Sequence, residues 1–229
     1  MSIAANITAI KEELKNTGVK LIAVSKTKPL ESIAEAYNAG QRVFGENTVQ
    51  EMVEKHEKLP KDIEWHLIGH LQSNKVKYLA SFVSMIHSVD SLKLMQEINK
   101  QAVKQNRIID CLLQIYIADE ETKFGMDFAE AVELLRSEEF NQLKNVKIRG
   151  VMGIATLTDN IRMIKDEFYE LKTFHDSLKK TFFRKDPDFT EISMGMSGDY
   201  RLAIEQGSTM VRLGSTLFGS RALNVNSKI

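Results

Sequence analysis

The 229-residue sequence has little cysteine, little proline, no long apolar run and no excess of charge of either sign. Its one cysteine, Cys111, excludes a disulfide within the chain, and its place in an apolar run predicts a buried strand residue in a reducing compartment. Three prolines and the lack of a Gly/Ser-rich tract give no sign of a linker. We therefore expect one domain over residues 1–229.

The balance of charge bears on the class of partner. The 31 basic and 31 acidic residues cancel, so the chain has no basic footprint for nucleic acid or an anionic membrane. The N-terminus has no basic segment before an apolar core, and no apolar stretch reaches membrane-spanning length. We therefore expect a cytoplasmic protein whose default partner is a small ligand.

The sequence does contain a regular alternation of two patterns. Segments with apolar residues at helical spacing alternate with short apolar runs typical of buried strands, which cover residues 21–26, 42–45, 64–69, 83–89, 108–117, 146–154, 190–196 and 209–214. Eight such repeats in a chain of this length predict an α/β fold, a single (β/α)8 TIM barrel with an extra N-terminal helix over residues 3–16. The alternative is an open doubly wound sheet, which usually has fewer strands and a glycine-rich first turn.

Polar residues predict where several helices begin. Asn47 with Gln50, and Asp127 with Glu130, have the spacing of a capping box. Ser197 is expected to cap the helix that follows the seventh run. These positions mark the turns after the strands, where the ligand site of a barrel lies.

The first apolar run ends on Lys26. Strand alternation places this side chain on the same side as Ile22 and Val24, so its ammonium either reaches solvent or lies at the mouth of a pocket. In a pocket, loss of water lowers the lysine pKa and yields the free amine that attacks an aldehyde to form a Schiff base. A solvated lysine is the commoner case for the residue type alone, and the rest of the chain favours the pocket.

Small residues end the seventh and eighth runs, over Ser193–Ser197 and Arg212–Thr216. Their backbone N–H groups lead into helix N-termini and suit an anion, although tight turns and a helix cap explain the same residues. In TIM barrels the loops after strands seven and eight are the usual phosphate site. A phosphate there and an amine across the mouth imply a phosphorylated aldehyde, and pyridoxal 5′-phosphate has both groups.

Six motifs in order over about residues 20–220 resemble those of the pyridoxal-phosphate homeostasis proteins: AVSKTKP at 23–29, FGEN at 44–47, WHLIG with LQSNK at 65–75, RGVM at 149–152, SMGMS at 193–197 and GSTMVRLG at 207–214. Three positions depart from the family pattern. Ser215 stands where threonine is frequent, His70 where proline is frequent, and Gly198 where an acidic residue is frequent. Ser215 keeps a hydroxyl and a backbone N–H, so only the detail of the ligand contact is affected.

The resemblance implies a single barrel like the N-terminal domain of alanine racemase, with cofactor-binding roles for Lys26, Asn47, Ser193, Ser197, Arg212, Gly214 and Ser215. Lys26 is expected to hold pyridoxal phosphate as an aldimine, and Asn47 to contact it near the ring. Arg212 is expected to face the pyridine nitrogen. The serines and the glycine at the ends of the seventh and eighth runs are expected to bind the phosphate.

The expected arginine favours keeping the cofactor over using it. A cation opposite the pyridine nitrogen disfavours protonation of the ring, which makes the ring a weaker sink for carbanion electrons. Without the family, an ion pair between Arg212 and a barrel carboxylate would explain the residue as well. We expect a monomeric, non-catalytic carrier that takes part in intracellular pyridoxal phosphate homeostasis and supplies apoenzymes.

Two other functions remain to be compared with the carrier. An amino-acid racemase of the alanine racemase type needs a second acid/base over the opposite face of the ring, and we expect no further domain to supply it. A scaffold without a ligand would leave Lys26 and the glycine-rich strand ends unexplained.

Two further features carry less weight. His66 and His70 have the spacing of zinc ligands on a helix, but their segment is predicted to be a strand and no cysteine or third histidine accompanies them, so no metal site is expected. Lys123 lies in a polar loop and is expected to be solvated; a secondary contact with the aldehyde is the less favoured alternative.

Overall fold

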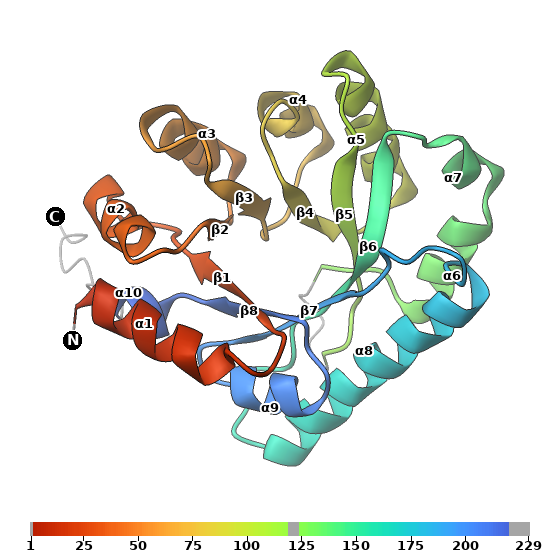
Figure 1. The fold of residues 1–229 in the computed structure, drawn as a ribbon. Helices are drawn as coiled ribbons and strands as arrows, with labels where there is room; N and C mark the ends of the chain where they lie inside the picture. Colours follow the sequence, from red (N-terminus) through yellow and green to blue (C-terminus); the bar gives the residue numbers. More distant parts are fainter. Residues whose placement is uncertain (1, 119–123, 220–229) are drawn as a thin grey trace, which may run out of the picture.

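Eight parallel strands close into a barrel in the computed structural model, which describes residues 2–118 and 124–219 (Figure 1). β1 pairs with both β2 and β8, so the predicted barrel is confirmed and the open sheet is excluded. The strands are Lys20–Val24 (β1), Val43–Glu46 (β2), Glu64–Leu67 (β3), Met85–Val89 (β4), Ile109–Gln114 (β5), Val146–Met152 (β6), Glu191–Met196 (β7) and Met210–Leu213 (β8).

Helices surround the strands on the outside, as Figure 1 shows. One of them, α7, lies where the sequence patterns predicted none. The helices are Ile3–Leu14 (α1), Leu30–Asn38 (α2), Val49–Lys58 (α3), Ser73–Lys75 (η1, a 3₁₀ turn), Val76–Leu79 (α4), Leu92–Lys104 (α5), Phe128–Arg136 (α6), Glu138–Gln142 (α7), Ile161–Thr181 (α8), Tyr200–Glu205 (α9) and Ser215–Phe218 (α10).

The helix caps confirm one prediction and correct two. Asp127 and Glu130 form the predicted capping box of α6. Asn47 does not cap α3: the hydroxyl of Thr48 accepts from the N–H of Glu51 at 3.4 Å instead. Ser197 does not cap α9, which begins at Tyr200, three residues later. Both side chains therefore remain in the loops that follow β2 and β7.

Apolar side chains fill two separate regions of the barrel. The larger core lies between the strands and the surrounding helices, and includes Cys111, which is buried and unpaired with any other cysteine, as predicted. A smaller cluster fills the inside of the barrel and consists of Ile22, Met85, Leu112, Met152 and Met210. Neighbouring strand residues point to opposite sides, so one strand can contribute to both regions, as β1 does with Leu21 in the larger core and Ile22 in the smaller cluster.

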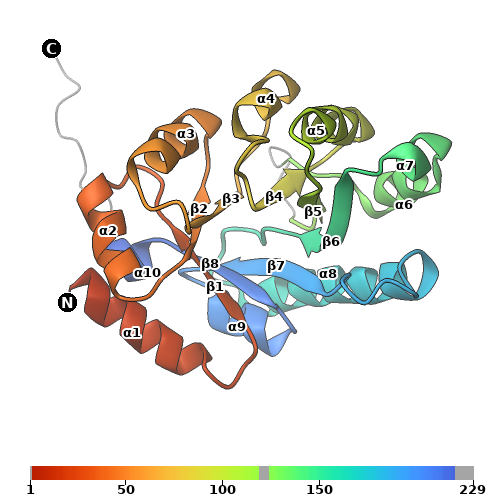
Figure 2. The same ribbon diagram turned by 45° about the horizontal axis from the view of Figure 1, so that its top comes forward.

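The predicted N-terminal helix links the start of the chain to its end. Figures 1 and 2 show α1 beside α2 and α10. The side-chain amide of Asn6 donates to the carbonyl of Leu217 at 3.0 Å, and the N–H of Ala4 donates to the carboxylate of Glu35 at 3.0 Å. α1 thereby holds α10, whose N-terminus follows β8.

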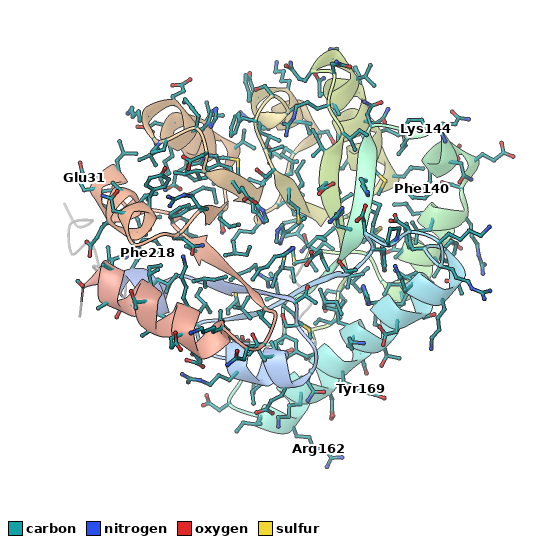
Figure 3. All side chains as sticks on the ribbon, viewed as in Figure 1. Glu31, Phe140, Lys144, Arg162, Tyr169 and Phe218 are labelled. Carbon is teal, nitrogen blue, oxygen red and sulfur yellow. The ribbon has the colours of Figure 1, made fainter. Side chains whose placement is uncertain are left out.

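The longest helix, α8, is amphipathic. Phe168 and Leu171 are fully buried, whereas Tyr169 and Arg162 point outward from the barrel in Figure 3. Among residues 2–118 and 124–219, no helix combines the length and the apolar character needed to span a bilayer.

Candidate functional site

A cavity of about 390 Å³ opens at the carboxyl ends of the strands, within the size range of small-ligand pockets. Six of the seven residues predicted from the sequence line it: Lys26, Asn47, Ser197, Arg212, Gly214 and Ser215. We call it the Lys26 cavity. Apolar wall comes from Val24, Ile68 and Ile154. These six residues, which the sequence analysis expected to share one site, come from segments up to 189 positions apart (215 minus 26).

Lys26 lies in a tight turn after β1, since the strand ends two residues earlier than predicted, at Val24. The turn, residues 25–28, is closed by the N–H of Lys28 donating to the carbonyl of Ser25 at 3.0 Å. Thr27, its third residue, has φ of 62°, as a type II turn requires. The lysine is half-buried at the cavity wall.

Backbone donors at the start of α10 converge on one hydroxyl. The N–H groups of Gly214 and Thr216 both donate to the Oγ of Ser197, at 3.2 and 3.4 Å. Gly198 and Ser215 lie beside them on the cavity wall, and a Cβ added to Gly198 would meet nothing within 4 Å. The two loops therefore form a small, open cradle of N–H and O–H donors, the chemistry that binds a phosphate.

Arg212 forms part of the cavity floor and is almost fully buried. Its guanidinium donates to the carbonyl and the hydroxyl of Ser193, both at 2.7 Å, and to the carbonyl of Gly153 at 2.9 Å. Burial lowers the pKa of Arg212 to about 10, which leaves the group a cation at neutral pH. The charge of Asp199 opposes the effect of burial on the pKa, but the contacts of the described residues include no ion pair between Arg212 and a carboxylate.

Ser193 is the one predicted residue that does not line the cavity. It is fully buried, and its hydroxyl lies between Arg212 and a ring nitrogen of His87, which is 2.9 Å away. His87 in turn lies 2.9 Å from His66. We call His66, His87, Ser193 and Arg212 the histidine chain. In this structure Ser193 orients the arginine, and its predicted contact with a phosphate stays a prediction.

Both histidines of this chain are neutral. Burial inside the barrel lowers the pKa of His66 to about 3, and burial lowers the pKa of His87 well below its usual value, with the charges of its neighbours adding to the effect. Arg212 is therefore the cation of the chain. Because arginine only donates, the Ser193 hydroxyl accepts a hydrogen bond from it and can donate its own hydrogen bond to His87.

Asn47 lines the cavity, and the loop that follows β3 approaches its backbone closely. A Cβ on Gly69 would lie 2.3 Å from the carbonyl oxygen of Asn47, so only glycine fits there. Asn47 also lines a larger groove of about 490 Å³ between α3 and the segment 70–78. That groove lacks the arginine and the backbone cradle, so the Lys26 cavity is the candidate site.

The two histidines considered for zinc point to different places. His66 belongs to the histidine chain, whereas His70 stacks on Phe124 and lies 3.4 Å from the carboxylate of Asp90. Among the residues that the structure describes, no group of three or more His, Cys, Asp or Glu side chains could hold a metal ion. Lys123 lies outside the described residues.

Three charged residues behind the turn 25–28 were given no role in the sequence analysis, although Glu46 belongs to the FGEN motif. Glu46 ends β2, and Glu51 and Lys55 are one helical turn apart on α3. The ammonium of Lys55 lies 2.8 Å from Glu46 and 2.6 Å from Glu51. We call them the anchor trio. The i,i+4 spacing of Glu51 and Lys55 was a visible signal, but it is usually that of a solvent-exposed pair.

Comparison with known proteins places the chain among relatives of similar length. The family described as alanine racemase, N-terminal domain, matches residues 1–222. A pyridoxal phosphate homeostasis protein of Aquifex aeolicus is 44% identical over 203 residues, which cover 88% of this chain and 87% of that protein. The structure of PipY from Synechococcus elongatus PCC7942, with PLP bound, has a TM-score of 0.85 at 38% identity and covers 95% of this chain and 100% of that chain.

More distant structures share the fold alone. Alanine racemase from Streptomyces lavendulae is 17% identical, with a TM-score of 0.75; the match covers 96% of this chain and 57% of that chain.

Proposed function

This chain belongs to the family of pyridoxal phosphate homeostasis proteins, and from that premise we propose that it binds pyridoxal 5′-phosphate in the Lys26 cavity. The observation that carries the proposal is the meeting of an amine, a buried guanidinium and a cradle of backbone donors in one cavity. Pyridoxal phosphate, when bound, supplies an aldehyde that can bond covalently to an amine.

Each part of the cavity suits one part of this ligand. The cradle at Ser197, Gly214 and Ser215 would bind the phosphate, because N–H and O–H donors near a helix start favour negative charge. Lys26, half-buried in the lining of the same cavity, would supply the amine. Val24, Ile68 and Ile154 would pack against the ring, and Asn47 would contact its polar edge.

We further propose that the chain acts as one domain that stores the cofactor without using it as an enzyme does. Arg212 would keep a fixed positive charge near the ring, and a cation opposite the pyridine nitrogen disfavours the protonated ring that carbanion chemistry needs. A carrier of this kind would act as a monomer in the cytoplasm and release the cofactor to apoenzymes. The names of the curated relatives support a role in homeostasis.

The direct test is an absorption spectrum of the purified protein with added pyridoxal phosphate. We expect a visible band that is lost in Lys26→Ala, and borohydride reduction should place the adduct on the peptide that contains Lys26. Recovery of the adduct chiefly on Lys28 or Lys123 would contradict the assignment. Pyridoxal without phosphate should bind far more weakly, since charge-assisted hydrogen bonds of about 1.5–3 kcal/mol each are lost.

Incubation of the loaded protein with L-alanine and other amino acids separates a carrier from a racemase. We expect only trace formation of D-isomer, keto acid or amine, because a well-placed second acid or base contributes about 10²–10⁴-fold in rate. Turnover at about 1 s⁻¹ or faster that disappears in Lys26→Ala would establish an enzyme instead. Sedimentation of the protein with and without cofactor would test the monomer.

A further inference from the structure

The turn that carries Lys26 is strained and is held from outside. Thr27 has φ of 62°, in a region that β-branched residues rarely adopt. The two residues on either side of Lys26 are bonded to side chains of the anchor trio, Glu46, Glu51 and Lys55, which lie on β2 and α3. The strain is therefore offset by partners that are distant in the sequence.

Five hydrogen bonds join the members of the anchor trio to the turn or to one another. The Ser25 hydroxyl donates to Glu46 at 2.6 Å, and the Thr27 N–H donates to Glu51 at 2.5 Å. The Lys55 ammonium donates to the Ser25 carbonyl at 2.7 Å and to both carboxylates. An ammonium has three hydrogens, so these three bonds saturate it.

Two members of the anchor trio, Glu46 and Lys55, are buried. Glu46 is fully buried and Lys55 is 4% exposed, so their charges lie out of water and depend on each other. The Ser25 carbonyl accepts from both Lys55 and the Lys28 N–H that closes the turn. Movement of the turn would therefore remove one hydrogen bond from each of these two buried charges.

We propose that the anchor trio positions Lys26: it holds the turn 25–28 in its strained form, so that the Lys26 amine faces the cavity at the angle needed for covalent attachment. The inference rests on the proposed binding of pyridoxal phosphate, and it concerns the covalent step. The cradle that would hold the phosphate lies in the loops after β7 and β8 and at the start of α10, and it makes no hydrogen bond with the anchor trio among the described contacts.

The two steps can be separated with two ligands. Pyridoxine 5′-phosphate has an alcohol in place of the aldehyde, so it reports on binding of the ring and phosphate without attachment. Pyridoxal 5′-phosphate reports on both. If the anchor trio has a merely structural role, a variant in it should weaken the binding of both ligands. If it positions Lys26, the variant should change only the covalent attachment of pyridoxal phosphate.

The variant is Glu51→Gln, because Glu51 is the member of the anchor trio with most solvent contact, at 26% side-chain exposure, and the fold should tolerate its change. Its matched control is Glu54→Gln on the same helix, which breaks only the exposed pair with Lys58. We expect Glu51→Gln to slow attachment of pyridoxal phosphate about tenfold or more, since small misplacements of a reacting group have effects of this size. Affinity for pyridoxine phosphate should change less than about twofold, and Glu54→Gln should match the wild type throughout.

A third measurement needs no cofactor. Amide exchange of Thr27 in the unloaded protein should become faster in Glu51→Gln and stay unchanged in Glu54→Gln, because the carboxylate accepts from that N–H. Equal attachment rates in the two variants, or equal loss of affinity for both ligands in Glu51→Gln, would overturn the inference. If the wild type itself forms no covalent bond, the proposed function fails, and amide exchange still decides whether the anchor trio holds the turn.

Discussion

The anchor trio and the histidine chain are both buried polar networks at the Lys26 cavity, but they differ in charge. The anchor trio joins two carboxylates to an ammonium outside the barrel wall, whereas the histidine chain joins two neutral rings to one cation inside it. The first holds a turn and the second holds an arginine. The Lys55 ammonium makes three hydrogen bonds from one nitrogen, which ties the turn to both carboxylates. In the barrel interior the histidines are neutral, and a second cation there would repel Arg212.

The largest expected effect comes from removing the cation of the anchor trio. Lys55→Met leaves Glu46 as a buried, unpaired carboxylate, so the free energy of unfolding should fall by about 3–5 kcal/mol in urea titration. Adding Glu46→Gln should restore much of the loss, because the uncompensated charge is removed. The control, Lys58→Met, breaks an exposed pair on the same helix. Equal losses in the two lysine variants would show that the burial of Lys55 has no energetic weight.

The histidine chain should respond most to acid. The pKa of His66 is lowered to about 3, so the unfolded chain takes up a proton below about pH 6.5 while the folded protein does not. Stability is therefore present above pH 6.5 and is lost as the pH falls toward 3, at about 1.4 kcal/mol per pH unit for this ring. His66→Gln should reduce the slope of unfolding free energy against pH by that amount between pH 6 and 4.5. An unchanged slope would mean that His66 is protonated in the folded protein.

A single hydroxyl connects the two halves of the histidine chain. Ser193→Ala removes a hydrogen bond to Arg212 and leaves a ring nitrogen of His87 without its partner, so we expect a loss of about 1.5–3 kcal/mol and weaker binding of pyridoxal phosphate. The control is Ser88→Ala. The Ser88 hydroxyl is equally buried but has no hydrogen-bond partner among the described residues, so its removal should cost little. Similar losses in both variants would mean that Ser193 acts only by packing.

The smallest expected effect has the opposite pH dependence. Burial raises the pKa of Glu46, despite the nearby Lys55, so the folded protein holds this proton more firmly than the unfolded chain. The stability that this protonation contributes is present below the ordinary glutamate pKa, and it is lost as the pH rises through the pKa of Glu46 in the folded protein. The melting temperature of the wild type should therefore decline relative to Glu46→Gln between pH 4 and 7. A rise in the melting temperature of the wild type relative to Glu46→Gln would show that the ion pair with Lys55 affects the pKa of Glu46 more than burial does.

The sequence predicted the barrel because its evidence is local. Each strand is a short apolar run and each long helix has its own periodicity, so eight strands could be recognised one by one. Six of the seven predicted residues reach one cavity for the same reason: the carboxyl ends of parallel strands meet at one edge. The functional roles of these residues remain predictions.

The parts that were missed depend on distant partners. β1 stops before Lys26 because Glu51 and Lys55 bond to the turn, and no local pattern shows that. Ser197 was assigned to a helix cap, but its hydroxyl accepts from Gly214, which comes 17 residues later. His87 lies in an apolar run, where a histidine has no local sign of its neighbour. Contacts of this kind follow from the closed sheet.

The contact between the first and last elements of the barrel has a consequence for biosynthesis. β1 pairs with β8, and Asn6 bonds to Leu217, 211 positions further along the chain. During translation the strand with Lys26 emerges first, while the loops that complete the cradle emerge last. A nascent chain therefore exposes the amine long before it can bind a phosphate, and the finished site forms only when β8 has left the ribosome and closed the barrel. If the Lys26 cavity binds the cofactor as proposed, loading follows synthesis, and we expect a ribosome-bound chain truncated before β8 not to bind the cofactor.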